Sequence, residues 1–119
     1  MSTRSNIVVK DSDSEHTIYH HCDGYLDGVG KELKEFIDTQ YKPYTRTADE
    51  FCKQMEYWDS SYKYDDSGIH GDVEYIYYVD IFTNTVEVSV EGIHYNKTPD
   101  GRYDENWEVI SSYSDVFDV

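Results

Sequence analysis

The sequence predicts an α+β fold, in which two helices pack on one face of a mostly antiparallel sheet of about four or five strands. Residues 6–10 form a β-branched run and residues 16–22 resume extended character, and later residues 73–82 and 85–91 show the two-residue alternation of strands. Between them, residues 25–40 and 48–58 show the three-to-four-residue period of helices. This order of strands, helices and strands favours an antiparallel sheet with its helices on one side.

The first two strands are expected to form a hairpin. Asn6–Lys10 is rich in β-branched residues and is followed by a polar turn over Asp11–Glu15. The chain becomes extended again over His16–Cys22, where Ile18 and His20 share one face because side chains alternate along a strand.

The first helix is expected from Tyr25 to Gln40, with Asp23 as its N-cap. Its apolar residues, spaced by three and four, are Leu26, Val29, Leu33, Phe36 and Ile37. Glycines occur at positions 24, 28 and 30, and a glycine inside a helix costs about 1 kcal/mol relative to alanine. Either the backbone of the chain or a partner is therefore expected to approach closely there.

The second helix is expected from Ala48 to about Trp58, because Thr47 and Glu50 have the spacing of a capping box. Ala48, Phe51 and Met55 would face inward, with Trp58 beside them, and residues 59–71 would form a loop.

Two further strands, Val73–Phe82 and Thr85–Glu91, would form a second hairpin around a turn at Thr83–Asn84. One face of the first of them would carry Val73, Tyr75, Tyr77, Val79 and Ile81. The opposite face would carry Glu74, Ile76, Tyr78, Asp80 and Phe82, and the second strand would turn Val86, Val88 and Val90 to one face. After a turn over residues 96–101, a last strand through Trp107 and Val109 is expected, with a frayed tail beyond about residue 112.

The composition predicts one domain over residues 1–119 with a strongly acidic surface. The net charge is −15, from 25 acidic and 10 basic residues. This charge argues against direct nucleic-acid binding, which requires basic side chains, and favours association with basic surfaces. Solubility alone is the alternative explanation of such a charge.

The cysteines and the hydropathy pattern predict a cytoplasmic protein, in the host cytoplasm if it is viral. Cys22 and Cys52 are too few for a disulfide framework and are expected to be free thiols. The first residues are polar rather than signal-like, and no apolar run is long enough to span a membrane.

Metal, cofactor and catalytic sites are not expected. His16, His20, Cys22 and Asp23 are close in sequence, but two histidines four residues apart on a strand lie about 13 Å apart and cannot share an ion. The acidic residues lack the calcium-loop spacing, and the glycines at 24–30 miss the phosphate-loop spacing by one residue. Neighbouring His21 and Cys22 point to opposite faces, whereas His21 and Asp23 could meet.

The first third of the chain carries a distinctive pattern. After the opening Met-Ser-Thr-Arg-Ser comes a motif formed by His21, Asp23, Gly24, Tyr25, Gly28, Val29 and Gly30. This pattern resembles a group of small uncharacterised bacteriophage and prophage proteins that carry His-Trp-Asp-Gly-Tyr-Pro-x-Gly-Val-Gly. Cys22 stands in place of their usual Trp, and Leu26 in place of their frequent Pro. The resemblance implies a phage or mobile-element origin and no particular activity.

The C-terminal half places acids beside tyrosines on its strands, a composition suited to binding a protein. The candidate partner-binding residues are Asp72, Glu74, Tyr78, Asp80, Glu87, Glu91, Asp104, Glu105 and Glu108. Carboxylates that alternate along a strand repeat every 6.6–6.8 Å or so, which is on the scale of phosphates along a nucleic-acid strand.

The leading functional hypothesis is a phage-encoded, non-enzymatic inhibitor of the anti-CRISPR or anti-restriction type. It would act as a monomer or homodimer and occupy a basic, nucleic-acid-binding surface of a host protein. One alternative is a small enzyme or ligand-binding protein centred on His21, Asp23 and Tyr25. Another is a structural or assembly role in the phage.

Overall fold

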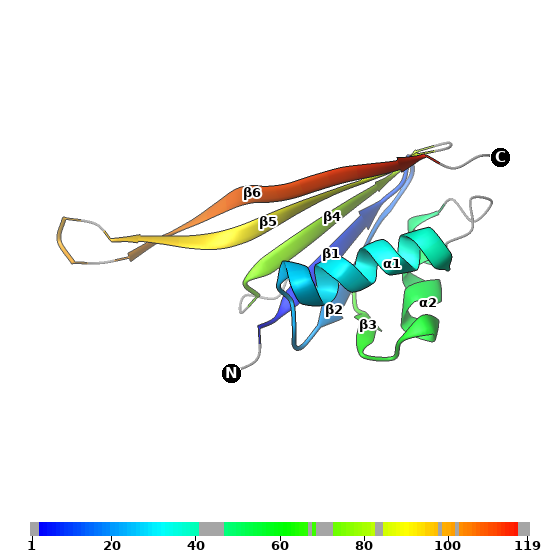
Figure 1. Ribbon diagram of the computed structural model, residues 1–119, viewed down its shortest axis with the longest axis horizontal. Coiled ribbons are helices and arrows are strands. Elements are labelled where there is room, and N and C mark those ends of the chain that lie inside the picture. Colours follow the sequence, from blue (N-terminus) through cyan, green and yellow to red (C-terminus); the bar gives the residue numbers. More distant parts are fainter. Residues whose placement is uncertain are drawn as a thin grey trace.

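The computed structural model describes residues 3–40, 47–66, 68, 73–82, 85–97, 99–101 and 103–116, and the side chains of all of these except 93–97 and 103–116. A single six-stranded sheet has the order β3-β2-β1-β4-β5-β6 (Figure 1). The strands are β1 (Ser5–Lys10), β2 (Glu15–His20), β3 (Tyr62–Tyr64), β4 (Tyr75–Ile81), β5 (Thr85–Lys97) and β6 (Tyr103–Val116). The helices are α1 (Lys31–Thr39) and α2 (Ala48–Trp58), and a π-helical turn, Leu26–Gly30, runs directly into α1.

The predicted α+β class is confirmed, with both helices on one face of a mostly antiparallel sheet. The one parallel pair joins β1 and β4, from Ser5↔Tyr75 to Lys10↔Asp80. Both helices lie in the connection between these strands, which is long enough for the crossover that parallel strands require.

The main core lies between the sheet and the helices. Strand residues such as Ile7, Tyr77 and Val88 pack with Phe36 and Phe51 of the helices, all with at most 1% of their surface exposed. Burying an apolar side chain of this size contributes roughly 1.5–3 kcal/mol, so this layer provides most of the stability of the fold. The predicted inward residues Ala48, Phe51 and Met55 are buried, as are Val86, Val88 and Val90.

A second, smaller cluster lies on the opposite face of the sheet, which we call the open face. It contains Val8, Val73 and Ile76, with Tyr19 and Tyr78 packed against them. The assignment of Val73 to the face of Tyr77 was wrong, because β4 begins only at Tyr75 and strand alternation does not extend back to Val73.

The first helix begins differently from the prediction. α1 starts at Lys31, and a π-helical turn occupies the positions expected to be its first turns. The Asp23 side chain is not an N-cap: the residue before the π-helical turn is Tyr25, with no side-chain cap. By contrast, Thr47 caps α2 as predicted and accepts a hydrogen bond from the Glu50 main-chain nitrogen at 3.2 Å.

The sheet is longer and wider than predicted. β3 lies within residues 59–71, which were expected to be loop, and pairs with β2 from Ile18↔Tyr64 to His20↔Tyr62. β6 continues beyond residue 112 and pairs with β5 as far as Thr85↔Val116. The turn predicted at Thr83–Asn84 lies outside the described residues, although the Phe82 main-chain nitrogen donates to the Thr85 carbonyl across it.

Candidate protein-binding surface

Close packing within the chain explains the glycines at positions 24, 28 and 30. A Cβ atom on Gly28 would lie 2.0 Å from the carbonyl oxygen of Asp23, closer than any side chain can come. A Cβ on Gly24 would lie 2.9 Å from that of Ser5 and 3.0 Å from the Thr3 carbonyl oxygen. The close approach that the glycines predicted is therefore made by the backbone of this chain itself.

The same motif is joined to the centre of the sheet through Tyr77. The buried Tyr77 hydroxyl donates a 2.6 Å hydrogen bond to the carbonyl of Gly24, and the Gly24 nitrogen donates to the carbonyl of Thr3 at 2.8 Å. A Cβ on Gly30 would lie 3.3 Å from the Tyr77 hydroxyl. These contacts hold the connection between β2 and α1 against β1 and β4.

Asp23 turns the chain into this connection with a φ of 53°, a left-handed conformation that aspartate tolerates better than most residues. Its carbonyl accepts from the Val29 nitrogen at 2.8 Å. Its carboxylate accepts from the exposed Tyr25 hydroxyl at 2.9 Å, and this hydrogen bond raises the pKa of Tyr25 above its usual value.

His21 does not meet Asp23, although sequence spacing allowed it. Its Nδ1 lies 3.4 Å from the Arg4 Nε donor and 3.2 Å from the Tyr19 hydroxyl. His21, Asp23 and Tyr25 are all exposed. The described contacts of the motif form a structural junction whose three polar side chains are open to solvent.

Sequence reasoning missed a polar network that links the buried His20 side chain to the surface. The His20 Nδ1 contacts the Cys22 carbonyl, its Nε2 lies 3.0 Å from the Ser61 hydroxyl, and that hydroxyl donates to Asp59 at 2.7 Å. The Ser61 main-chain N–H, the largest favourable contact, holds the pKa of Asp59 below its usual range.

This network is not arranged for nucleophilic catalysis. An activated serine needs a neighbouring base free to take its proton, but the Ser61 hydroxyl donates to Asp59 instead. The Asp59 carboxylate would also repel the negative charge that develops on an attacked carbonyl. The network instead joins β2 to the turn before β3, where the His20 ring packs on that of Tyr62 with centroids 4.3 Å apart.

The histidines, cysteines and acids of the described residues do not form a cluster of metal ligands. No three of these side chains come together in a group that could hold an ion. Cys22 is exposed and Cys52 is buried, both as free thiols, and burial raises the pKa of Cys52 well above its usual value.

Tyr78, Asp80, Glu87 and Glu91 lie on the open face of β4 and β5. We call these residues, together with the exposed Phe82 just beyond the end of β4, the acidic strip. The strand register sets Asp80 directly opposite Glu87, and Tyr78 opposite Ser89. Side chains opposite each other lie about 4.5–5.5 Å apart at their Cβ atoms, and two carboxylates in that position destabilise a sheet. The strip therefore concentrates negative charge on the open face, with Lys10 beside Asp80 on the neighbouring strand β1.

The aromatic members of the strip lie beside the carboxylates. Burial raises the pKa of Tyr78, as do the charge of Glu91 and a hydrogen bond to it. Phe82 leaves 53% of its surface exposed at the end of β4, although it is one of the largest apolar side chains. Aromatic residues at the surface are frequent anchors of protein interfaces. Phe82 was not among the predicted binding residues, and only its exposure identifies it.

The remaining predicted binding residues are distributed outside the strip. Glu74 is exposed just before β4, and Asp72 lies outside the described residues. Asp104, Glu105 and Glu108 lie on β6, where the structure gives their backbone positions. Sequence reasoning also missed Glu15, which lies on the open face of β2 and forms a 3.8 Å ion pair with Lys10.

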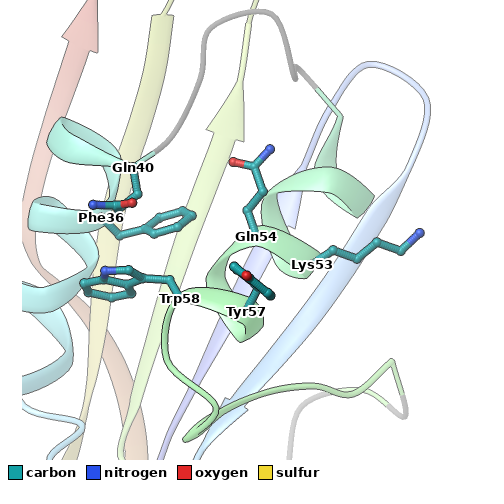
Figure 2. Close-up of a pocket in the computed structure, with 6 residues that line it drawn as sticks. All are labelled: Phe36, Gln40, Lys53, Gln54, Tyr57 and Trp58. Atoms are coloured by element: carbon teal, nitrogen blue, oxygen red, sulfur yellow. The ribbon is translucent and has the colours of Figure 1, made fainter.

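A pocket of about 660 Å³ lies between the two helices, on the face of the molecule opposite the strip. It is lined by Phe36, Gln40, Lys53, Gln54, Tyr57 and Trp58 (Figure 2). The Phe36 and Trp58 rings lie 5.4 Å apart, whereas Lys53 points away and pairs with Asp49 at 2.9 Å. The sequence pattern gave no signal for this pocket.

No family model, curated protein or solved structure matches this chain. Among the described helices, none has the length and apolar character needed to cross a bilayer.

Proposed function

We propose that this chain is a phage-encoded acidic binding protein that inhibits a host protein, of the anti-CRISPR or anti-restriction type. In this proposal the acidic strip covers a basic, nucleic-acid-binding surface of the target. The observation that carries the proposal is the concentration of Asp80, Glu87 and Glu91 on the open face, where Asp80 lies opposite Glu87 and the one neighbouring lysine on the described strands is Lys10, beside Asp80 on β1. A cationic partner would find three carboxylates there. The net charge of −15 and the resemblance of the N-terminal third to phage proteins support the same function.

The strip suits such a partner in two ways. Its carboxylates, Asp80 on β4 and Glu87 and Glu91 on β5, would steer association with a basic cleft. The exposed Phe82 ring adds an apolar contact that phosphates lack, and this contact would favour a protein target over small cations.

The test is affinity capture from a bacterial host lysate at low and at high salt, with mass spectrometry of the retained proteins. We expect a nucleic-acid-binding protein that elutes as salt rises and that added nucleic acid displaces. A strip variant, Asp80→Asn/Glu87→Gln/Glu91→Gln, should retain at least ten times less of it.

The matched control is Asp13→Asn/Asp27→Asn/Glu35→Gln, which removes the same charge at exposed positions outside the strip. It should retain the target nearly as well as the unmodified chain does. An equal loss of the target in both variants would mean that binding depends on the overall negative charge and that the strip has no specific role. A target that nucleic acid fails to displace would contradict the proposed mode of inhibition.

A further inference from the structure

The outer edge of β6 is a feature that the acidic strip does not use. β6 is last in the strand order and pairs on one side with β5, from Lys97↔Tyr103 to Thr85↔Val116. Among the described residues, no strand pairs with its other side. Such an edge presents a row of unpaired N–H and C=O groups that can receive another strand. At the opposite edge of the sheet, β3 spans only Tyr62–Tyr64 and offers little room for pairing.

Part of this edge belongs to a projecting ribbon. β4 stops pairing with β5 at Tyr75↔Gly92, whereas β5 and β6 continue together from Ile93↔Trp107 to Lys97↔Tyr103. Figure 1 shows this ribbon extending away from both helices, and the molecule measures 55 × 27 × 25 Å. A two-stranded ribbon is only marginally stable in water, so a third strand would stabilise it.

The sequence of β6 indicates which kind of strand would fit. Residues 103–116 include Asp104, Glu105, Glu108 and Asp115, and no lysine or arginine. A second copy of β6 would bring the same acids to within one strand spacing, about 4.8 Å, where like charges repel. Charge complementarity therefore disfavours self-pairing and favours a basic strand.

An irregularity limits where such a strand would lie. Val90 pairs with Ser111 and Glu91 with Val109, so Ile110 is an extra residue in β6. A bulge of this kind interrupts an edge ladder. The regular stretch that includes the ribbon, residues 103–109, contains three of the four acids.

We propose that the edge of β6 over residues 103–109 binds an extended basic segment of a partner protein as a seventh strand. The inference rests on the proposed function in one respect, that the partner of this acidic chain is a basic protein. It adds the mode of binding: main-chain hydrogen bonds to the edge of β6 provide affinity, and the acids select lysine or arginine side chains.

The experiment uses the full chain and a labelled, terminally blocked peptide of seven alternating lysines and valines. Two control peptides of the same sequence carry N-methyl groups on all the valine amides or on all the lysine amides. Both control peptides keep the charge of the unmodified peptide, but each lacks the main-chain N–H donors along one side of the strand. We expect the unmodified peptide to bind in fluorescence anisotropy, and at least one methylated peptide to bind at least ten times more weakly. Hydrogen exchange should show new protection of amides within 103–109.

Equal binding of all three peptides would mean attraction by charge alone and would overturn the proposal, as would no binding at all. A stable dimer in sedimentation without peptide, with 103–109 already protected, would assign the edge to a second copy and also overturn it. The strip variant distinguishes this proposal from the proposed function. The proposed function could be wrong although the edge of β6 does bind basic strands. In that case the lysate yields no target, but the strip variant still binds the unmodified peptide in preference to a methylated one.

Discussion

At Gly28, the absence of a Cβ atom decides the geometry of the motif. A Cβ atom on Gly28 would lie 2.0 Å from the Asp23 carbonyl oxygen. The Cβ would be attached to the backbone of Gly28, and the oxygen belongs to the backbone of Asp23, so neither atom can move without opening the π-helical turn. Gly30 is less constrained, because the nearest atom to its Cβ position is the Tyr77 hydroxyl at 3.3 Å. The two glycines look equivalent in the sequence, but their surroundings differ.

We therefore expect Gly28→Ala to lower the free energy of unfolding by more than about 3 kcal/mol, in the range of severe steric substitutions. Gly30→Ala should change it by about 1 kcal/mol or less, because alanine's preference for helix offsets the mild contact with Tyr77. Urea unfolding of both variants measures the difference. Equal effects of the two substitutions would contradict the packing explanation of the motif.

At the scale of elements, Asp11 joins the β1–β2 turn to the start of α2. Its carboxylate accepts from the main-chain nitrogens of Asp13, Ser14 and Ala48, each at 2.7 Å. Burial opposes its ionisation, but these hydrogen bonds outweigh that effect and lower the pKa of Asp11 below its usual value. A carboxylate at a helix N-terminus also interacts favourably with the helix dipole.

Asp11→Asn should therefore destabilise the protein by about 1 kcal/mol at pH 7. Because the folded-state pKa is the lower one, this stability is complete above the unfolded value of about 4 and disappears as pH falls through the folded value. Urea unfolding of both proteins across pH 2–7 should show the two curves converging at the acid end. Asp13→Asn, an exposed change in the same turn, is the control and should have little effect. A constant difference at all pH values would show that the charge of Asp11 is not responsible.

At the scale of the whole molecule, the net charge is a property that opposes folding. With a net charge of −15, the folded chain repels itself, and the Asp80–Glu87 pair concentrates part of that repulsion on the open face. A surface used for binding often keeps such unfavourable groups, whereas a surface that is acidic for solubility alone has no need to oppose them directly.

Asp80→Asn should accordingly raise the free energy of unfolding by about 0.2–1 kcal/mol at low salt, the range for cross-strand pairs. The gain should shrink in 1 M salt, where the screening length falls to about 3 Å. Asp13→Asn removes the same charge from an exposed turn and should give a smaller gain. Thermal unfolding at two salt concentrations tests this, and a loss of stability in Asp80→Asn would mean that Asp80 makes a stabilising contact.

Local sequence determined most of the elements, because alternation and helical periodicity reflect which side chains must leave water. The period-two pattern through Val86, Val88 and Val90 and the capping pair Thr47 and Glu50 both correspond to observed structure. The class of the fold followed from the order of these elements alone. The acidic and tyrosine-rich character of the later strands was likewise visible in the sequence.

Only the tertiary structure decided how these pieces meet. β3 has too few residues for a periodic signal and exists because β2 offers it an edge. The register that opposes Asp80 and Glu87, and the end of β4 that leaves the β5–β6 ribbon projecting, depend on pairing between distant segments. The role of the glycines depended on which atoms occupy the space beside them, and sequence spacing contains no such information. Long-range contacts of this kind are set by packing the whole chain, which is why local patterns did not reveal them.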